Sequence, residues 1–208
     1  MKKQPDTIDY FSIGGKIKVN TFKKVLQNGY KNDTSNIDGY EIDKSLSGKR
    51  SQVYHNKEKN HTIINHRGTQ GIHDLYTDVQ LMFNNTNNKR FDHGKKITDE
   101  AIKKYNNSDI TVTGHSLGHA IAQEANKKHD KELVTLNGAI TPNDLIRRQK
   151  DNEFVVRSNY DPVSMLHNLR PMKNNDNTVN IKAKSWNPLT EHKTDVLDRL
   201  DQDEYIGK

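Results

Sequence analysis

A serine between two glycines lies near the middle of the chain, in the pentapeptide Gly114-His115-Ser116-Leu117-Gly118. Such a serine attacks an ester carbonyl when a base removes its proton, and a sharp strand-to-helix turn exposes its hydroxyl. The β-branched run "DITVT" precedes the pentapeptide and the helical pattern "AIAQEANKK" follows it. The pattern predicts a nucleophilic Ser116, with Gly114 and Gly118 letting strand and helix backbones pass close together. The alternative is a serine that only caps a helix.

A nucleophilic serine also needs a histidine base and a carboxylate that orients this base. In the chain order serine, acid, histidine, the best acid is Asp161, because it follows the β-rich run "EFVVRS" at its carboxyl end. An ordinary turn aspartate before a proline is the alternative. His192 lies in a loop after the last expected strand and is the favoured base. His167 stays open as the second choice, although it lies only six residues beyond Asp161.

Two backbone amides are candidates for an oxyanion hole, which stabilises the negative charge of the tetrahedral intermediate. The Leu117 N–H follows the serine at the start of the expected helix. The Thr69 N–H follows a β-rich run and a glycine in "IINHRGT". Taken alone, the Arg-Gly-Thr stretch is also compatible with a simple turn.

The elements that position these residues alternate between β-rich runs and helical spacings. Strands are expected at 61–68, 109–113, 132–140, 153–158 and 177–185, and helices at 73–83, 97–107, 117–130 and 194–200, with Thr98 as a helix cap. Alternation of this kind predicts an α/β fold with a mostly parallel central sheet flanked by helices.

Length and composition suit a single domain over residues 1–208. Residues 1–50 form a polar lead-in, with a short candidate strand at 17–19 and another beyond it at 52–55, and residues 50–200 form the core. Cysteine is absent, which excludes disulfides and thiolate metal sites, and we expect neither a metal nor another cofactor. No signal peptide or membrane-spanning run is visible, so we expect a soluble protein, cytoplasmic or virion-associated. The oligomeric state stays open.

The net charge of +6 has two readings. Most lysines at this composition cover a solvated surface. The sharper reading is attraction to an anionic phospholipid surface, which predicts a transient membrane contact. Nucleic-acid binding is not expected, because no RNA-binding or helix-turn-helix signature is present.

Four segments together resemble the class 3 (fungal-type) lipases of the α/β-hydrolase fold, as in a compact microbial or viral member. They are "INHRGTQGIHDLYTDVQ", "VTGHSLGHAIAQ", "DPVSML" and "NPLTEHKTDVL", in that order, covering about residues 50–200. The resemblance implies Ser116 as nucleophile, Asp161 as the orienting acid and His192 as the general acid and base.

The same resemblance implies Thr69 and Leu117 as oxyanion donors, with Asp78 steadying Thr69. Residues 70–84 correspond to the family's lid, with Leu75 in place of its usual tryptophan. His119 replaces a small residue beside the elbow, so it must fit at a crowded contact between helix and strand.

The expected function is hydrolysis of lipid carboxylic esters through an acyl-enzyme, with triacylglycerol, monoacylglycerol and phospholipid open as substrates. The main alternative is a non-catalytic lipase-like module that binds a membrane or a protein, in a virion for example. A third is another activity of the same fold, such as acyl transfer or peptide hydrolysis.

Overall fold

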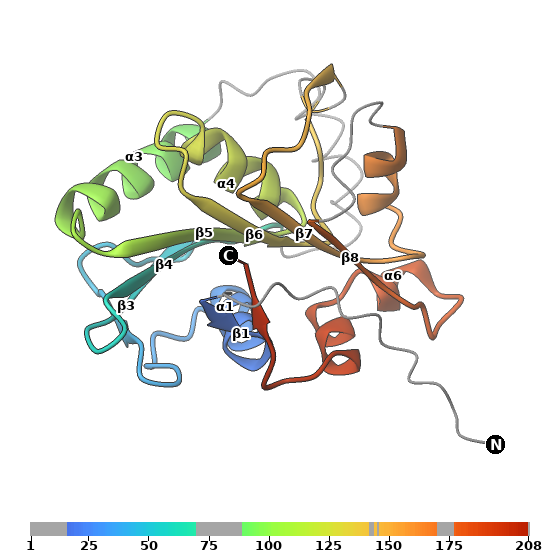
Figure 1. Cartoon of the computed structure of the whole chain (residues 1–208), viewed down its shortest axis with the longest axis horizontal. Helices are drawn as coiled ribbons and strands as arrows, with labels where there is room; N and C mark the ends of the chain where they lie inside the picture. Colours follow the sequence, from blue (N-terminus) through green and yellow to red (C-terminus); the bar gives the residue numbers. More distant parts are fainter. Residues whose placement is uncertain (1–15, 70–88, 142–143, 145, 170–176, 208) are drawn as a thin grey trace.

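The computed structural model describes residues 16–69, 89–141, 144, 146–169 and 177–207, and its centre is one seven-stranded sheet (Figure 1). The strand order is β2-β3-β4-β5-β6-β7-β8. The strands are β2 (Glu41–Ile42), β3 (Ser51–Asn56), β4 (His61–His66), β5 (Asp109–His115), β6 (Glu132–Leu136), β7 (Glu153–Ser158) and β8 (Thr178–Ile181).

Strands β4 to β8 are parallel, whereas β2 and β3 extend the sheet in antiparallel fashion. The carboxyl ends of β4 to β8 therefore meet at one edge, where parallel α/β sheets carry their reactive groups. The predicted α/β class with a mostly parallel sheet is confirmed, because long β-branched runs buried on both faces leave few other arrangements.

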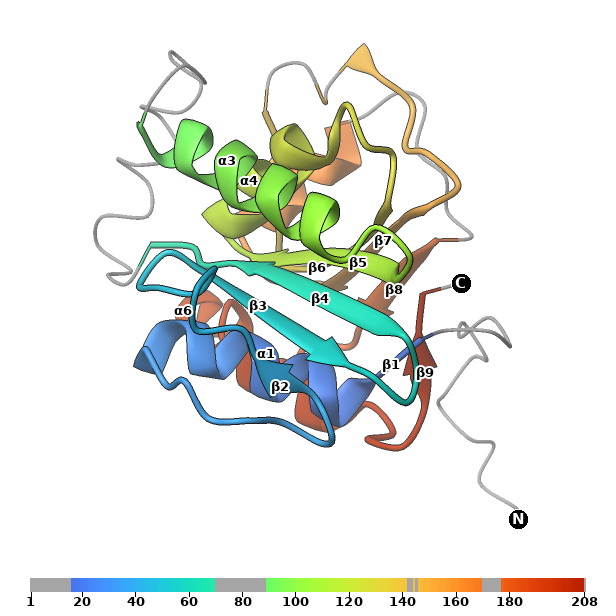
Figure 2. The same ribbon diagram turned by 90° about the vertical axis from the view of Figure 1, so that its left-hand side faces the viewer.

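Helices cover both faces of the sheet, as Figures 1 and 2 show. One face carries α3 (Lys89–Lys104) and α4 (Leu117–Asn126), and the other carries α1 (Val19–Lys31) and the 3-10 helix η2 (Thr194–Arg199). Neighbouring residues of β4 pack on opposite faces of the sheet. Ile63 packs in the cluster with α1, and Ile64 packs in the cluster with α3 and α4.

Helix α1 was missed in the sequence, where residues 1–50 were read as a polar lead-in. Its buried positions include Val19, Phe22, Val25 and Leu26, which follow helical spacing and pack under the sheet. The candidate strand at 17–19 shrinks to β1 (Ile17–Lys18), which pairs with β9 (Tyr205–Ile206) near the end of the described chain. The candidate strand at 52–55 lies within β3.

The prediction that Thr98 caps a helix is wrong. Helix α3 begins nine residues earlier, at Lys89, and Thr98 lies buried in its interior. The Thr98 hydroxyl is satisfied by Nε2 of His66 at 2.9 Å. A local threonine pattern cannot reveal that partner, because it comes from a distant strand.

Two short helices follow the last two strands of the sheet, η1 (Ser164–Leu169) after β7 and α6 (Pro188–Glu191) after β8. The segment at 194–200, expected as an ordinary helix, forms the 3-10 helix η2. The expected helix at 73–83 and the lid at 70–84, with Leu75 and Asp78, lie outside the described residues. None of the helices in the described ranges combines the length and apolar character needed to cross a membrane.

Candidate active site

Ser116 occupies the turn between β5, which ends at His115, and α4, which begins at Leu117. Its backbone has φ 59° and ψ −127°, a conformation that side-chain-bearing residues rarely adopt. Backbone strain of this kind clusters at functional sites. The Ser116 side chain makes no capping hydrogen bond to α4, so the alternative that this serine only caps a helix is wrong.

The two elbow glycines are needed for close backbone approach. A Cβ on Gly118 would lie 2.0 Å from the carbonyl oxygen of His66, and one on Gly114 would lie 2.3 Å from the backbone of Gly118. Both distances are far inside van der Waals contact. The predicted role of these glycines therefore matches the packing of β4, β5 and α4 around the serine.

The Ser116 side chain is buried, with 1% of its surface exposed, and its hydroxyl has no hydrogen-bond partner among the described residues. Its backbone is firmly held. The N–H donates to Leu136 O at 3.2 Å, and the carbonyl accepts from His119 N and Ala139 N. Catalytic hydrogen bonds are often long before substrate binds, so a free hydroxyl does not argue against a nucleophile.

Asp161 and His192 are brought together at the carboxyl edge. Asp161 follows β7, and its Oδ1 accepts a hydrogen bond from Nδ1 of His192 at 2.5 Å. Its Oδ2 accepts from the Ser164 backbone N–H at 2.7 Å, which fixes the carboxylate. With Nδ1 donating, Nε2 is the nitrogen of His192 that can take up a proton.

His167, the second choice for the base, makes a different contact. Its Nε2 lies 3.2 Å from the carbonyl oxygen of Gly138, and its ring packs edge-on against His119. No hydrogen bond between His167 and Asp161 occurs in the described ranges. His119 itself fits its crowded position because Gly138 leaves room for the ring and Thr135 bonds its Nδ1 at 2.8 Å.

A buried carboxylate next to His192 holds the loop that carries it. Glu191 forms a bidentate ion pair with Arg199, at 2.5 and 3.0 Å, and also accepts from the Ser158 hydroxyl. Burial opposes its ionisation, but these donors and the amides of residues 184 and 185 hold its pKa at about 2. Sequence reasoning missed Glu191 and Arg199, because nothing local marks a carboxylate for burial.

A second connection reaches His192 from α1. His115 Nε2 donates to the His192 carbonyl oxygen at 2.6 Å, so its Nδ1 accepts from the Tyr30 hydroxyl at 2.7 Å. Burial, with a smaller contribution from His192, lowers the pKa of His115 to about 3, which keeps this ring neutral. The Tyr30 hydroxyl also lies against Gly68, where an added Cβ would be 2.7 Å from its oxygen. Tyr30 went unnoticed because α1 was not predicted.

The Gly68–Thr69 loop lies against the elbow. A Cβ on Gly68 would be 3.1 Å from the Ser116 Cβ. Arg90 of α3 holds the loop through weak hydrogen bonds to Thr69 Oγ1 at 3.4 Å and to the Arg67 carbonyl oxygen at 3.3 Å. Leu117 is the first residue of α4, so its N–H has no intrahelical acceptor. Leu117 thus follows Ser116 directly, and Thr69 follows the glycine that packs against the Ser116 side chain.

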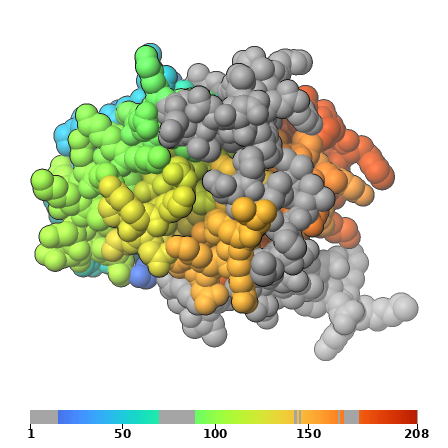
Figure 3. Space-filling view, turned by 90° about the horizontal axis from the view of Figure 1, so that it is seen from above, coloured from blue at the N-terminus to red at the C-terminus, as the bar shows by residue number. Residues whose placement is uncertain are grey.

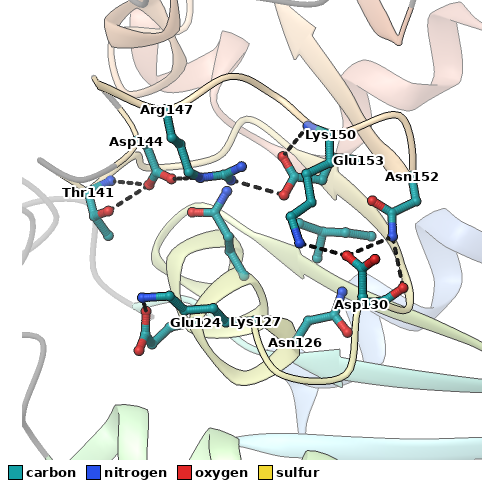
Figure 4. A pocket seen from close by; sticks show the side chains of 12 residues that line it. Glu124, Asn126, Lys127, Asp130, Thr141, Asp144, Arg147, Lys150, Asn152 and Glu153 are labelled. Carbon is teal, nitrogen blue, oxygen red and sulfur yellow. Dashed lines mark hydrogen bonds and ion pairs between the residues drawn. The ribbon is translucent and has the colours of Figure 1, made fainter.

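A separate charged pocket of about 250 Å³ lies between the end of α4 and the segment joining β6 to β7 (Figure 4). Its charges are matched internally: Arg147 pairs with Asp144 at 2.8 Å and with Glu153 at 3.0 Å, and Lys150 pairs with Asp130 at 2.6 Å. Within the described ranges, this pocket included, no group of three or more His, Asp or Glu side chains is arranged so that it could hold a metal ion. None of the proposed active-site residues lines it.

The chain is similar to one known protein family and to several solved structures. Residues 21–168 match a family described as "Phospholipase-like: Tle-like phospholipase domain". Among solved structures, the chain is similar to a Rhizomucor miehei lipase–propeptide complex (14% identity, 80% of this chain and 72% of that chain, TM-score 0.47). It is also similar to a Penicillium expansum triacylglycerol lipase (19% identity, 71% of each chain, TM-score 0.49). No curated protein sequence matches significantly.

Proposed function

Because the chain belongs to the family of Tle-like phospholipase domains, we propose that it hydrolyses carboxylic ester bonds of lipids, and of phospholipids in particular. The family supports lipid ester hydrolysis as the general activity. The choice of phospholipid over triacylglycerol or monoacylglycerol is our proposal, and it rests on the family description and on the net charge of +6, which favours an anionic lipid surface.

The proposed reaction starts at the Ser116 hydroxyl. Its oxygen attacks the ester carbonyl carbon while His192 Nε2 takes the hydroxyl proton. The Asp161 carboxylate, which accepts from His192 Nδ1, keeps the ring in the required tautomer and stabilises the positive charge that the ring acquires. The backbone amides of Thr69 and Leu117 hold the oxyanion.

Collapse of this intermediate breaks the ester bond. His192 returns the proton to the leaving alcohol, which for a phospholipid is the lysophospholipid, and the acyl group remains on Ser116. Water then attacks the acyl-enzyme as His192 takes one of its protons. Release of the fatty acid restores the serine hydroxyl, so no cofactor or further reactant is needed.

One observation carries the proposal: the 2.5 Å contact between Asp161 and His192 next to a strained serine turn. Ser116 follows β5, Asp161 follows β7, and His192 follows β8 and α6, so each comes after the carboxyl end of a different parallel strand. His115 connects two of them, because it precedes Ser116 in the chain and its ring lies 4.8 Å from that of His192.

The test compares wild type with Ser116→Ala on p-nitrophenyl butyrate and on phosphatidylcholine vesicles. We expect wild type to release fatty acid and lysophospholipid, and Ser116→Ala to be slower by about 10³-fold or more. Ser35→Ala, at an exposed serine, is the matched control and should retain the wild-type rate. Equal rates for wild type and Ser116→Ala would reject the serine mechanism. A folded wild type that is inert on both substrates would favour the non-catalytic module.

A further inference from the structure

Large apolar side chains are exposed beside the proposed active site. Trp186 is 90% exposed, Tyr160 50% and Leu189 37%, and Met165 is exposed on the neighbouring η1. Tyr160 directly precedes Asp161 in the chain, and Leu189 lies three residues before His192. Clusters of exposed apolar residues of this size mark interaction surfaces more often than isolated ones do.

This surface is held in place by ordered contacts. The Tyr160 and Trp186 rings stack with centroids 5.7 Å apart. Asn187 caps α6 by accepting from the Leu189 N–H at 3.0 Å, and Glu191 accepts from the Ser185 N–H at 2.8 Å. The buried Glu191 carboxylate thus holds the loop that carries Trp186 through the preceding residue. The indole is therefore exposed from an ordered loop.

Basic residues lie close to Trp186 and Leu189 along the chain. Lys182, Lys184 and Lys193 are exposed, and within the described residues none of them forms an ion pair with a carboxylate. Between residues 182 and 199 the three lysines and Arg199 outnumber Glu191, Asp195 and Asp198, and Glu191 pairs with Arg199 while Asp198 pairs with Lys23. The local balance is therefore positive. Figure 3 shows the orange-to-red C-terminal part of the chain forming one margin of the molecule.

We propose that Tyr160, Trp186 and Leu189, with the three lysines near them in the sequence, form a docking surface for anionic phospholipid membranes. This inference builds on the proposed function, since it supplies the surface that brings a lipid substrate to Ser116. Tryptophan and tyrosine favour the interface between headgroups and acyl chains because one end of each ring system is apolar and the other polar. Lysines at the same level attract anionic headgroups.

The chain offers a direct probe, because Trp186 is its only tryptophan. Its fluorescence is measured in the Ser116→Ala background, so that the lipid is not consumed. With vesicles of phosphatidylglycerol and phosphatidylcholine in equal parts, we expect the emission to shift to shorter wavelength. With phosphatidylcholine alone the shift should need far more lipid. An emission spectrum that stays unchanged while the protein binds the vesicles would overturn the proposal.

Variants in the same background separate the two contributions in a vesicle flotation assay. Trp186→Ser and Leu189→Ser should each lower the partition coefficient by roughly tenfold. Lys184→Gln and Lys193→Gln should each lower it by about fivefold on anionic vesicles only. Tyr205→Ser is the matched control, because this half-exposed tyrosine lies beside the first residues of β4 and β5, at the opposite edge of the sheet. Its partition coefficient should equal that of the parent.

Failure of this inference is distinct from failure of the proposed function. Wild type that hydrolyses p-nitrophenyl butyrate, together with vesicle binding that survives Trp186→Ser and Leu189→Ser combined, would overturn the docking surface alone. Absence of ester turnover with Trp186-dependent vesicle binding would leave the docking surface standing and reject the enzyme. Self-association that disappears in the combined variant, without any vesicle binding, would assign the surface to a second copy and overturn the proposal.

Discussion

The Nε2 of His115 donates to the backbone carbonyl of His192 across 2.6 Å, so the residue before the proposed nucleophile holds the proposed base. His115 is in turn held by the hydroxyl of Tyr30, which reaches it from α1 at 2.7 Å. The Tyr30 oxygen also packs against Gly68, 2.7 Å from the position that a Cβ would take there. One phenol therefore connects the loop of the proposed oxyanion hole, the elbow and the base.

Tyr30→Phe removes this connection while keeping the ring. We expect kcat to fall by about tenfold with little change in KM, since the groups that act in the transition state lose alignment while substrate contacts remain. Steady-state kinetics on p-nitrophenyl butyrate measures the effect.

The chain contains a chemical twin for control. Tyr40 donates to Nδ1 of His61 at the same 2.7 Å, but His61 is the first residue of β4, at the opposite edge of the sheet. Tyr40→Phe should cost about 1 kcal/mol of stability, as Tyr30→Phe does, and leave kcat unchanged. Equal losses of kcat in the two variants would mean that Tyr30→Phe acts only by lowering the stability of the fold.

The two candidate bases are separated by amide substitutions. His192→Gln should lower kcat by about 10⁴-fold, because the proton acceptor is lost, and Asp161→Asn should have an effect of similar size because the ring loses its tautomer. His167→Gln should keep most of the activity, since its ring lies against the Gly138 carbonyl and His119, and the Asp161 carboxylate bonds His192 instead. An inactive His167→Gln beside an active His192→Gln would reverse the assignment.

Stability should fall steeply in mild acid. Burial lowers the pKa of His61 to about 4 and of His66 and His115 to about 3, from the ordinary 6.5. Below pH 6.5 the unfolded chain binds protons that the folded chain excludes. The stability from these groups is therefore complete above that pH and is lost as the pH falls towards 4. The slope should approach about 4 kcal/mol per pH unit for three protons.

Urea unfolding at pH 8, 7, 6 and 5 measures this dependence. The midpoint should be flat between the two higher values and fall between the two lower ones. A midpoint at pH 5 equal to that at pH 7 would mean that these rings are protonated without unfolding, contrary to their burial.

Gly118→Ala should prevent normal folding. The new methyl would lie 2.0 Å from the His66 carbonyl oxygen, and neither backbone can retreat without separating β4 from α4. We expect a loss of about 3 kcal/mol or more. Gly48→Ala is the matched control, because nothing lies within 4 Å of the corresponding position, and it should change the thermal midpoint little.

The sequence predicted the sheet well, and the physical reason lies in its strands. Parallel strands buried on both faces need continuous β-branched runs such as those of β5 and β7, and these are visible without any partner. The pentapeptide around Ser116 is recognisable for a similar reason. Its glycines are required by close backbone contacts, and these recur wherever a strand turns sharply into a helix.

Long-range pairing explains what was missed. Helix α1 carries only a narrow apolar stripe among polar residues, and its 3- and 4-residue spacing from Val19 to Leu26 was the signal that could have revealed it. Glu191 and Tyr30 had no such signal. Their importance comes from Arg199 and His115, and only the folded chain brings these pairs together.

The positive φ of Ser116 implies a trade-off between the stability of the fold and the proposed catalytic role. A residue with a side chain at φ 59° and ψ −127° costs roughly 1 to 3 kcal/mol, and glycine avoids most of this cost. Ser116→Gly should therefore unfold at higher urea concentration than Ser116→Ala, although both are expected to be inactive. If the two unfold together, the turn carries no such penalty. A related protein without the hydrolytic activity would gain stability from glycine at this position.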